Sequence, residues 1–84
     1  MIKGTSLFAN VGIGETYFKD AGIEICLANE LIEERAKFYK HLYPKSDMIC
    51  GDFTNPFVFN LLVNKHREYG CEFLIATPPC QGMS

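Results

Sequence analysis

The end of this sequence carries a residue that could act as a nucleophile. In the segment from Ala76 to Ser84, ATPPCQGMS, Cys80 follows two prolines and a run of apolar residues. Prolines stiffen a loop, and a cysteine thiolate is a strong nucleophile where its surroundings lower the pKa of the thiol. Most free cysteines, in contrast, are small buried hydrophobic residues. The position of Cys80 alone therefore leaves both interpretations open.

A glycine turn near the start of the chain could hold a ligand. The stretch from Phe8 to Gly14, FANVGIG, follows apolar residues and precedes a predicted helix. Glycine lets the backbone approach a ligand closely, and the N-terminus of a helix favours an anionic group such as a phosphate or a carboxylate. The alternative is a tight turn from a strand to a helix without a ligand.

Two carboxylates follow later apolar stretches. Glu30 comes about twenty residues after the glycine turn, where an acidic residue commonly binds the ribose hydroxyls of a nucleoside cofactor. Asp52 follows the next stretch and could accept a hydrogen bond from an adenine amino group. Each also has a structural interpretation, Glu30 as a carboxylate favoured by a helix dipole and Asp52 as a cap. Together they are typical of a cofactor cleft.

Apolar runs and periodic apolar positions predict the elements that position these residues. The predicted strands are Thr5–Ala9, Ile23–Ala28, Asp47–Cys50 and Glu72–Thr77. The predicted helices are Glu15–Ala21, Leu31–Leu42 and a third from Pro56 to about Tyr69, opened by Thr54-Asn55-Pro56. Gly22, Pro44 and Gly70 mark the ends of these helices in turn.

The β-α-β-α-β-α-β order predicts an α/β fold with a parallel sheet. The strands are continuous apolar runs, as expected when helices cover both faces of a sheet. Right-handed crossovers favour the sheet order 3-2-1-4, with a switch point between the first and fourth strands, beyond whose carboxyl ends ligands bind. We therefore expect the turn Asn10–Gly14 to lie beside Pro79-Cys80.

Composition and charge limit the classes of function. The chain has 84 residues, of which 48% are hydrophobic, and this suits one small folded domain. Its formal net charge is -2, whereas surfaces that bind duplex nucleic acid are usually basic. The sequence shows no secretory signal, no membrane-spanning run and no zinc-type cysteine spacing. We therefore expect a cytoplasmic protein with reduced thiols and no bound metal.

The remaining cysteines and the histidines have ordinary structural interpretations. Cys26, Cys50 and Cys71 lie within or beside predicted strands, so we expect them to pack in the core. His41 and His66 lie on predicted helix faces near lysines, so we expect both to be solvated.

Taken together, these residues resemble the N-terminal part of a DNA (cytosine-5)-methyltransferase. The segment PPCQGMS at 78–84 resembles the catalytic motif of that family, a Pro-Cys-Gln-Gly core followed by an aromatic residue and serine. The segment SLFANVGIG at 6–14 resembles its glycine-rich cofactor motif, and Asn29-Glu30 and Gly51-Asp52 match its second and third motifs. The resemblance spans residues 1–84. It implies a single partial domain, a Rossmann-like S-adenosyl-L-methionine-dependent methyltransferase half-domain.

The resemblance implies a binding site for S-adenosyl-L-methionine. By this likeness Phe8 contacts the adenine ring, and Gly12 belongs to the turn around the methionine part of the cofactor. Glu30 binds the ribose hydroxyls, and Asp52 binds the adenine amino group.

The resemblance also implies a reaction. Cys80 would be the nucleophile that adds to carbon 6 of cytosine, and Pro79 and Gln81 would bind the substrate base. The addition makes carbon 5 reactive toward the sulfonium methyl group, and the base must leave the DNA stack to reach the thiol. The implied activity is methylation of carbon 5 of cytosine in DNA, as in restriction-modification.

The sequence departs from the family pattern in the cofactor and catalytic motifs. Ser6 replaces the usual aspartate, Asn10 and Ile13 replace glycines, and Met83 replaces the common aromatic residue. The bulky side chain of Ile13 could narrow the cofactor turn. The later motifs that assist at the base and grip DNA are absent from these 84 residues. We therefore expect a fragment that is inactive alone, with DNA bound mostly by parts absent here.

Two other functions stay open. The chain could be a non-catalytic subunit or remnant that acts by association with a second, complementary chain. It could also be a fragment of a Rossmann-like oxidoreductase, although the Pro-Pro-Cys-Gln-Gly segment argues against this. In the predicted sheet order the apolar fourth strand lies at the edge of the sheet, so we expect the isolated chain to self-associate or to be poorly soluble.

Overall fold

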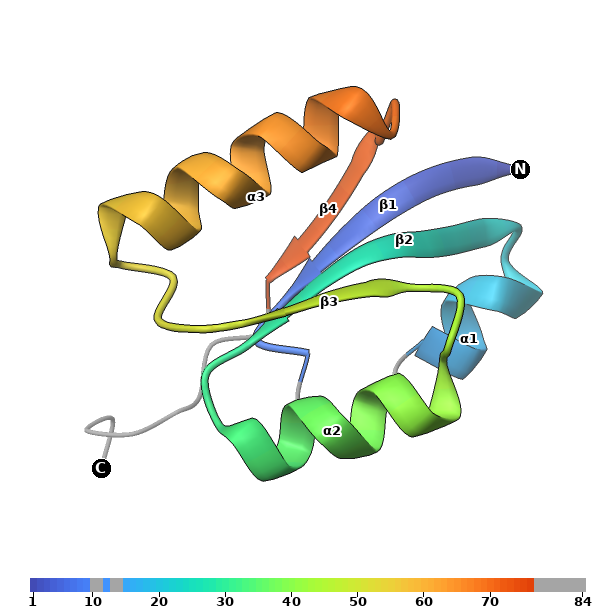
Figure 1. The fold of residues 1–84 in the computed structure, drawn as a ribbon. Helices are drawn as coiled ribbons and strands as arrows, with labels where there is room; N and C mark the ends of the chain where they lie inside the picture. Colours follow the sequence, from blue (N-terminus) through green and yellow to red (C-terminus); the bar gives the residue numbers. More distant parts are fainter. Residues whose placement is uncertain (10–11, 13–14, 77–84) are drawn as a thin grey trace, which may run out of the picture.

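A computed structural model of the protein describes residues 1–9, 12 and 15–76, within which strands and helices alternate (Figure 1). The elements are β1 (Ile2–Leu7), α1 (Glu15–Asp20), β2 (Ile23–Glu30), α2 (Glu33–Leu42), β3 (Asp47–Cys50), α3 (Pro56–Glu68) and β4 (Phe73–Ala76). The three strand pairs are all parallel, and the sheet order is β3-β2-β1-β4. The predicted α/β fold and the predicted sheet order are confirmed.

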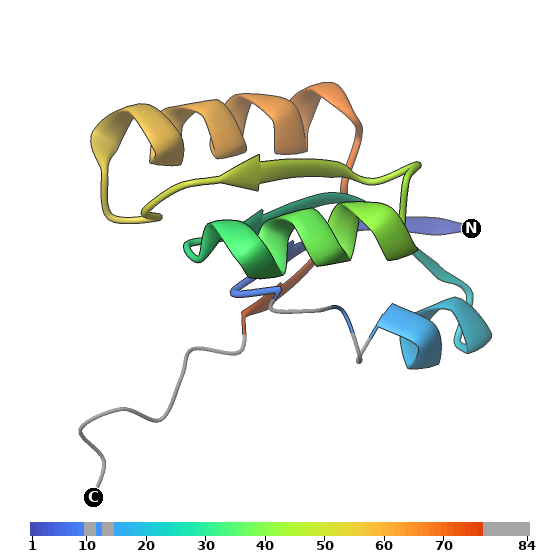
Figure 2. The same ribbon diagram turned by 60° about the horizontal axis from the view of Figure 1, so that its bottom comes forward.

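Helices cover both faces of the sheet. In Figures 1 and 2, α3 lies on one face, and α1 and α2 lie on the other. Leu27 and Ala28 are neighbours in β2, and both are fully buried. Leu27 packs with Leu62 of α3, whereas Ala28 packs with Tyr39 of α2. Because successive strand residues point to opposite faces, a continuous apolar run suits a strand that is covered on both sides.

The helix ends follow the signals in the sequence. Asn55 is the N-cap of α3, and its side chain accepts a hydrogen bond from the backbone N–H of Phe57. Pro56 begins the helix, where its missing N–H costs nothing. Gly22 after α1 and Gly70 after α3 adopt positive φ angles of 83° and 70°. Glycine adopts this left-handed conformation without the steric cost that a Cβ imposes.

Three boundaries differ from the prediction near the carboxyl edge of the sheet. The first strand ends at Leu7 rather than Ala9, because Phe8 has a φ of 56° and leaves the extended conformation. The second strand extends to Glu30, which pairs with Cys50. The second helix begins only at Glu33, because its N-cap, Ile32, is still extended.

The predictions for the cysteines and histidines hold only in part. Cys50 is exposed, so the prediction that it packs in the core is wrong; it ends β3, a short strand at one edge of the described sheet. Cys26 and Cys71 are half-buried. His41 is exposed, as predicted. His66 is half-buried, with its Nδ1 atom 2.7 Å from the Thr5 hydroxyl, because α3 packs across β1.

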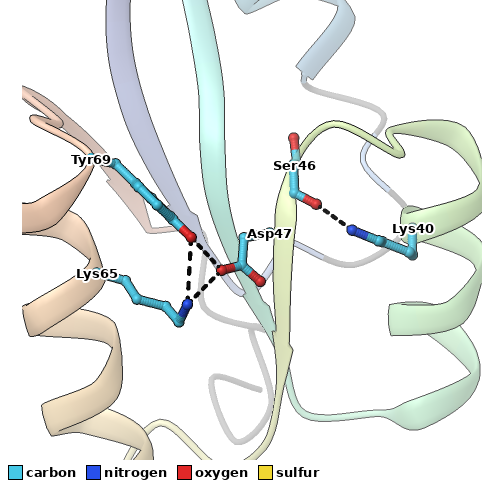
Figure 3. Close-up of polar contacts among 5 residues, drawn as sticks. All are labelled: Lys40, Ser46, Asp47, Lys65 and Tyr69. Atoms are coloured by element: carbon cyan, nitrogen blue, oxygen red, sulfur yellow. Dashed lines mark hydrogen bonds and ion pairs between the residues drawn. The ribbon is translucent and has the colours of Figure 1, made fainter.

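Polar side chains fix the helices to β3 (Figure 3). The Asp47 carboxylate lies 2.8 Å from Lys65 Nζ, and it accepts a hydrogen bond of 2.7 Å from the Tyr69 hydroxyl. Lys40 of α2 donates to the backbone carbonyl of Ser46, just before β3. The position of β3 relative to α2 and α3 is therefore set by directional contacts as well as by apolar packing. Among the described residues, no helix is long and apolar enough to cross a membrane.

Candidate functional site

The carboxyl ends of the strands form one edge of the sheet. Leu7, the last residue of β1, pairs with Asn29 on one side and with Ala76 on the other. Glu30 pairs with Cys50 at the end of β3. Parallel strands that end together present the residues following them on the same edge. Phe8, Glu30 and the segment that begins at Gly51 therefore share this edge, as the sequence predicted.

The turn after β1 begins with a left-handed residue. Phe8 has a φ of 56°, a conformation that only a few per cent of non-glycine residues adopt. The backbone N–H of the next residue, Ala9, donates to the carbonyl of Asn29 at 2.9 Å, so the turn is fixed to the end of β2. The Phe8 ring lies 6.1 Å from the Phe53 ring, centroid to centroid, and Phe53 directly follows Asp52. An aromatic pair therefore joins the turn to the segment after β3.

Gly12 lies so close to two tyrosine rings that any larger residue at this position would force the rings or the backbone to move. It has a φ of 79°, and a Cβ atom at this position would lie 2.5 Å from Cε2 of Tyr43 and 2.8 Å from Cδ2 of Tyr39. Its carbonyl accepts hydrogen bonds from the Tyr43 hydroxyl at 2.6 Å and from the Glu15 backbone N–H at 3.2 Å. Gly12 is thus packed against the end of α2 and is hydrogen-bonded to the first residue of α1.

Glu30 is a buried carboxylate at the end of β2. Only 5% of its surface is exposed, and its Oε2 atom accepts a hydrogen bond of 2.8 Å from the backbone N–H of Ile32. This bond supports the structural role near the start of α2 that the sequence also allowed. A buried carboxylate with a fixed orientation is also a suitable acceptor for ligand hydroxyl groups.

Asn29 links the segments that carry the two predicted carboxylates. Its side-chain amide is buried and donates to the carbonyls of Ile49 at 2.8 Å and Gly51 at 3.1 Å. In return the backbone N–H of Gly51 donates to the carbonyl of Glu30 at 3.0 Å. The end of β2 and the segment before Asp52 therefore form one hydrogen-bonded unit. Sequence reasoning placed Asn29 in a motif but gave it no role.

Asp52 is exposed and shapes the loop before α3. Its Oδ1 atom accepts hydrogen bonds from the Thr54 backbone N–H at 2.9 Å and from the Thr54 hydroxyl at 2.7 Å. These bonds stabilise the ionised form and lower the pKa of Asp52 below its ordinary value. The capping role that the sequence allowed is therefore present. Both bonds go to Oδ1, so the Oδ2 atom of Asp52 could accept a hydrogen bond from a ligand while the cap is kept.

A third carboxylate, Glu15, lies at the start of α1, and sequence reasoning gave it no role. Its surface is 7% exposed, and burial raises the pKa of its carboxyl group although a hydrogen bond with Ser6 lowers it in part. Ser6 occupies the position at which the family motif usually has aspartate. Because serine carries no charge, this chain does not place a second carboxylate beside Glu15.

Pro79, Cys80 and Gln81 lie outside the described residues, as does most of the turn Asn10–Gly14. The expected proximity of this turn to Cys80 stays a prediction. The described part of the edge offers carboxylate acceptors beside aromatic rings, and carboxylate oxygens can accept hydrogen bonds from the hydroxyl and amino groups of a nucleoside. Within the described residues, no group of three or more His, Cys, Asp or Glu side chains is arranged to hold a metal ion.

Sequence reasoning did not identify Phe53 or Tyr43 as residues near the site. Phe53 is adjacent to Asp52, so its position after a strand end could have indicated a place on this edge. Tyr43 contacts Gly12 across 31 residues of sequence, and no local pattern indicates such a contact.

Comparisons with known proteins agree with this fold and these motifs. The sequence profile of the family described as C-5 cytosine-specific DNA methylase matches residues 2–84. The Type II methyltransferase M1.HgaI of Avibacterium volantium is 47% identical over 83 residues, which are 99% of this chain and 23% of that protein.

Two solved structures share the fold. DNMT2 of Spodoptera frugiperda matches with a TM-score of 0.77 at 20% identity, over 100% of this chain and 24% of that one. A prophage-encoded protein of E. coli matches with a TM-score of 0.78 at 22% identity and the same coverage. The chain spans less than a quarter of the length of these relatives.

Proposed function

The chain belongs to the family of C-5 cytosine-specific DNA methylases, and we propose that it is the cofactor-binding and nucleophile-bearing segment of a cytosine methyltransferase. A methyltransferase needs a methyl donor, and we propose S-adenosyl-L-methionine for this chain. The observation that carries this proposal is the hydrogen-bonded edge on which Glu30 and the segment leading to Asp52 lie together.

The residues of this edge suit the parts of that cofactor. Glu30 would accept hydrogen bonds from the ribose hydroxyls, and Asp52 would accept one from the adenine amino group. Phe8 would contact the adenine ring, which suits its position beside Phe53. Gly12 would belong to the turn around the methionine part, where the absence of a Cβ lets the backbone turn at positive φ.

Cys80 would supply the nucleophile for the methyl transfer. Its thiolate would add to carbon 6 of cytosine and make carbon 5 electron-rich; loss of the carbon 5 proton and of the thiolate after methylation would restore the ring. The bound cofactor would supply the methyl group as an electrophile. Pro79 and Gln81 would hold the base, which must leave the DNA stack to reach the thiol.

Duplex DNA is the proposed substrate, and most of its binding surface would lie outside these 84 residues. The net charge of -2 supports this, because duplex-binding surfaces are usually basic. Methyl transfer would therefore require a complementary methyltransferase segment, and the proposed place of action is the cytoplasm.

A second candidate function is supported by the edge of the sheet. Among the described residues β4 pairs only with β1, and Leu74 is 57% exposed. A non-catalytic subunit that acts by adding a second chain along β4 would also have this geometry.

Cofactor binding tests the leading proposal. Titration calorimetry of the chain with S-adenosyl-L-methionine is expected to give saturable binding, whereas NAD is expected to give none. Glu30→Gln and Asp52→Asn should each weaken binding about tenfold, because each replaces a carboxylate acceptor by an amide. Glu34→Gln on the exposed face of α2 is a control that should bind like the original chain. Preferential binding of NAD would contradict the proposal and favour the oxidoreductase alternative.

A methyl-transfer assay distinguishes the two proposals, a catalytic segment and a non-catalytic subunit. The chain alone is expected to transfer no labelled methyl group to cytosine-containing duplex DNA. Mixed with a candidate second chain, it should become active, and Cys80→Ala should abolish that activity without weakening cofactor binding. Full activity of the Cys80→Ala mixture would show that this chain acts by association only.

A further inference from the structure

Two tyrosines at the end of α2 contact Gly12, and they differ in whether the hydroxyl group forms a hydrogen bond. Tyr39 and Tyr43 lie one helical turn apart, with ring centroids separated by 5.0 Å. Both rings lie within 3 Å of the place where a Cβ on Gly12 would be. Only the Tyr43 hydroxyl, however, forms a hydrogen bond with the turn, donating to the Gly12 carbonyl at 2.6 Å. The Tyr39 hydroxyl is buried and makes no hydrogen bond in the part of the chain that the structure describes.

Tyr43 is itself held in place by the backbone around it. Its N–H donates to the Tyr39 carbonyl at 2.8 Å, and its carbonyl accepts from the Ser46 N–H at 3.1 Å. The Ser46 hydroxyl donates to the Ile25 carbonyl of β2, and Lys40 donates to the Ser46 carbonyl at 2.9 Å (Figure 3). The Tyr43 ring therefore projects from a segment that is fixed to both α2 and β2.

The described atoms of the turn have anchors on two neighbouring elements. The Ala9 N–H is fixed to Asn29 at the end of β2, and the Gly12 carbonyl is fixed to Tyr43 at the end of α2. The Gly12 N–H also donates to the Ala9 carbonyl at 3.0 Å. The Gly12 carbonyl is thus held by Tyr43, and the Gly12 N–H is held by Ala9, which is itself bonded to the end of β2.

We propose that Tyr43 is a positioning residue whose hydroxyl holds the Gly12 carbonyl, so that the Gly12 backbone is preorganised for the methionine part of the cofactor. This inference rests on the proposed function, because it assigns to Tyr43 an effect on cofactor binding. A preformed turn avoids the conformational cost of ordering the loop when the ligand binds. The deletion of one hydroxyl should therefore lower affinity without removing any group that touches the cofactor.

The matched pair Tyr43→Phe and Tyr39→Phe tests this inference. Each variant removes one hydroxyl and keeps the ring that packs against Gly12, so both should fold. In carbon-13 spectra of the full chain without ligand, the Gly12 carbonyl resonance should move upfield in Tyr43→Phe, because that carbonyl loses a donor. It should stay unchanged in Tyr39→Phe, whose hydroxyl makes no such bond.

Calorimetric titration with S-adenosyl-L-methionine gives the functional readout. Tyr43→Phe should bind about fivefold more weakly, the effect of one lost hydrogen bond, whereas Tyr39→Phe should bind like the original chain. Equal affinity of Tyr43→Phe and the original chain would overturn this inference and leave the proposed function intact. No binding by the original chain would overturn both. An equal loss in the two variants would also overturn it, because that result would show a general packing effect.

Discussion

The side-chain amide of Asn29 donates a hydrogen bond of 3.1 Å to the backbone carbonyl of Gly51. These residues are the first members of the pairs Asn29-Glu30 and Gly51-Asp52, so the bond joins the two segments that carry the proposed cofactor carboxylates. A second bond from the same amide reaches the Ile49 carbonyl. A buried amide with both donors used fixes the spacing of two strand ends more firmly than apolar packing does.

Replacement of Asn29 by aspartate should destabilise the protein. The variant Asn29→Asp keeps the size of the side chain but places a carboxyl group against two backbone carbonyls that then lose their donor. The expected loss is about 2 kcal/mol of unfolding free energy, within the range for an unsatisfied buried group. Urea unfolding at neutral pH measures it. Asn60→Asp on the exposed face of α3 should change stability little, and an equal loss in both variants would contradict this role.

The comparison of Gly12→Ala with Gly22→Ala separates backbone strain from packing. Both glycines have nearly the same positive φ, 79° and 83°, so both substitutions impose similar strain of about 1 kcal/mol. A Cβ at residue 12 would also lie 2.5 Å from the Tyr43 ring, whereas a Cβ at residue 22 would have nothing within 4 Å. Gly12→Ala should therefore be the more destabilising variant in thermal unfolding. Equal melting temperatures would show that the tyrosine rings move aside easily.

The fold could be predicted from sequence because its signals are local. A short apolar run marks β2, β3 and β4, each helix has its own start or stop residue, and the handedness of crossovers leaves few sheet orders. The place of Glu30 and Asp52 on one edge then follows from their positions after parallel strands. The exact end of β1 did not follow, because no pattern indicated that Phe8 would adopt a left-handed conformation.

The contacts that fix the site could not be predicted, because they depend on how helices pack. His66 reaches Thr5 across 61 residues, and Tyr43 reaches Gly12 across 31. A histidine next to a lysine on a helix is typical of a solvated face, so the sequence pattern favoured the wrong environment for His66. The burial of such residues is decided by the rotation of a helix about its axis, which apolar periodicity defines only coarsely.

The ion pair of Asp47 should make stability depend on pH. Partial burial alone would raise the pKa of Asp47, but hydrogen bonds from Lys65 and Tyr69 outweigh it and hold the pKa below its ordinary value. Because the pKa is lower in the folded state, this contribution is present above about pH 4 and is lost as the pH falls further. Chemical unfolding at pH values from 6 down to 3 should show a shallower decline for Asp47→Asn.

Other carboxylates also make stability depend on pH, so the measurement needs controls. Asp52 also has a lowered pKa and contributes with the same sign, whereas the raised pKa of Glu15 contributes with the opposite sign. The difference between Asp47→Asn and the original chain is therefore the quantity to compare. Asp20→Asn, at an exposed site in the last turn of α1, should keep the original profile. An unchanged profile in Asp47→Asn would mean that the ion pair does not stabilise the fold.

The edge at β4 should make the isolated chain self-associate. Among the described residues β4 pairs with β1 alone, from Phe73 opposite Gly4 to Ala76 opposite Leu7. The other side of β4 therefore presents backbone groups without a strand partner, and Leu74 in this strand is 57% exposed. Such an edge templates pairing with a second copy, and burial of apolar surface adds about 25 cal/mol per Å². Sedimentation over a concentration series should show dimers or larger species.

A charge on the edge should suppress this association, because lysine on an edge strand opposes pairing with another chain. Leu74→Lys is therefore expected to sediment as a monomer at concentrations where the original chain associates. The matched control is Phe57→Lys on α3, since Phe57 is 86% exposed but lies away from the edge. Equal suppression by both variants would assign the association to general surface hydrophobicity. A monomeric original chain throughout the series would show that the β4 edge is shielded.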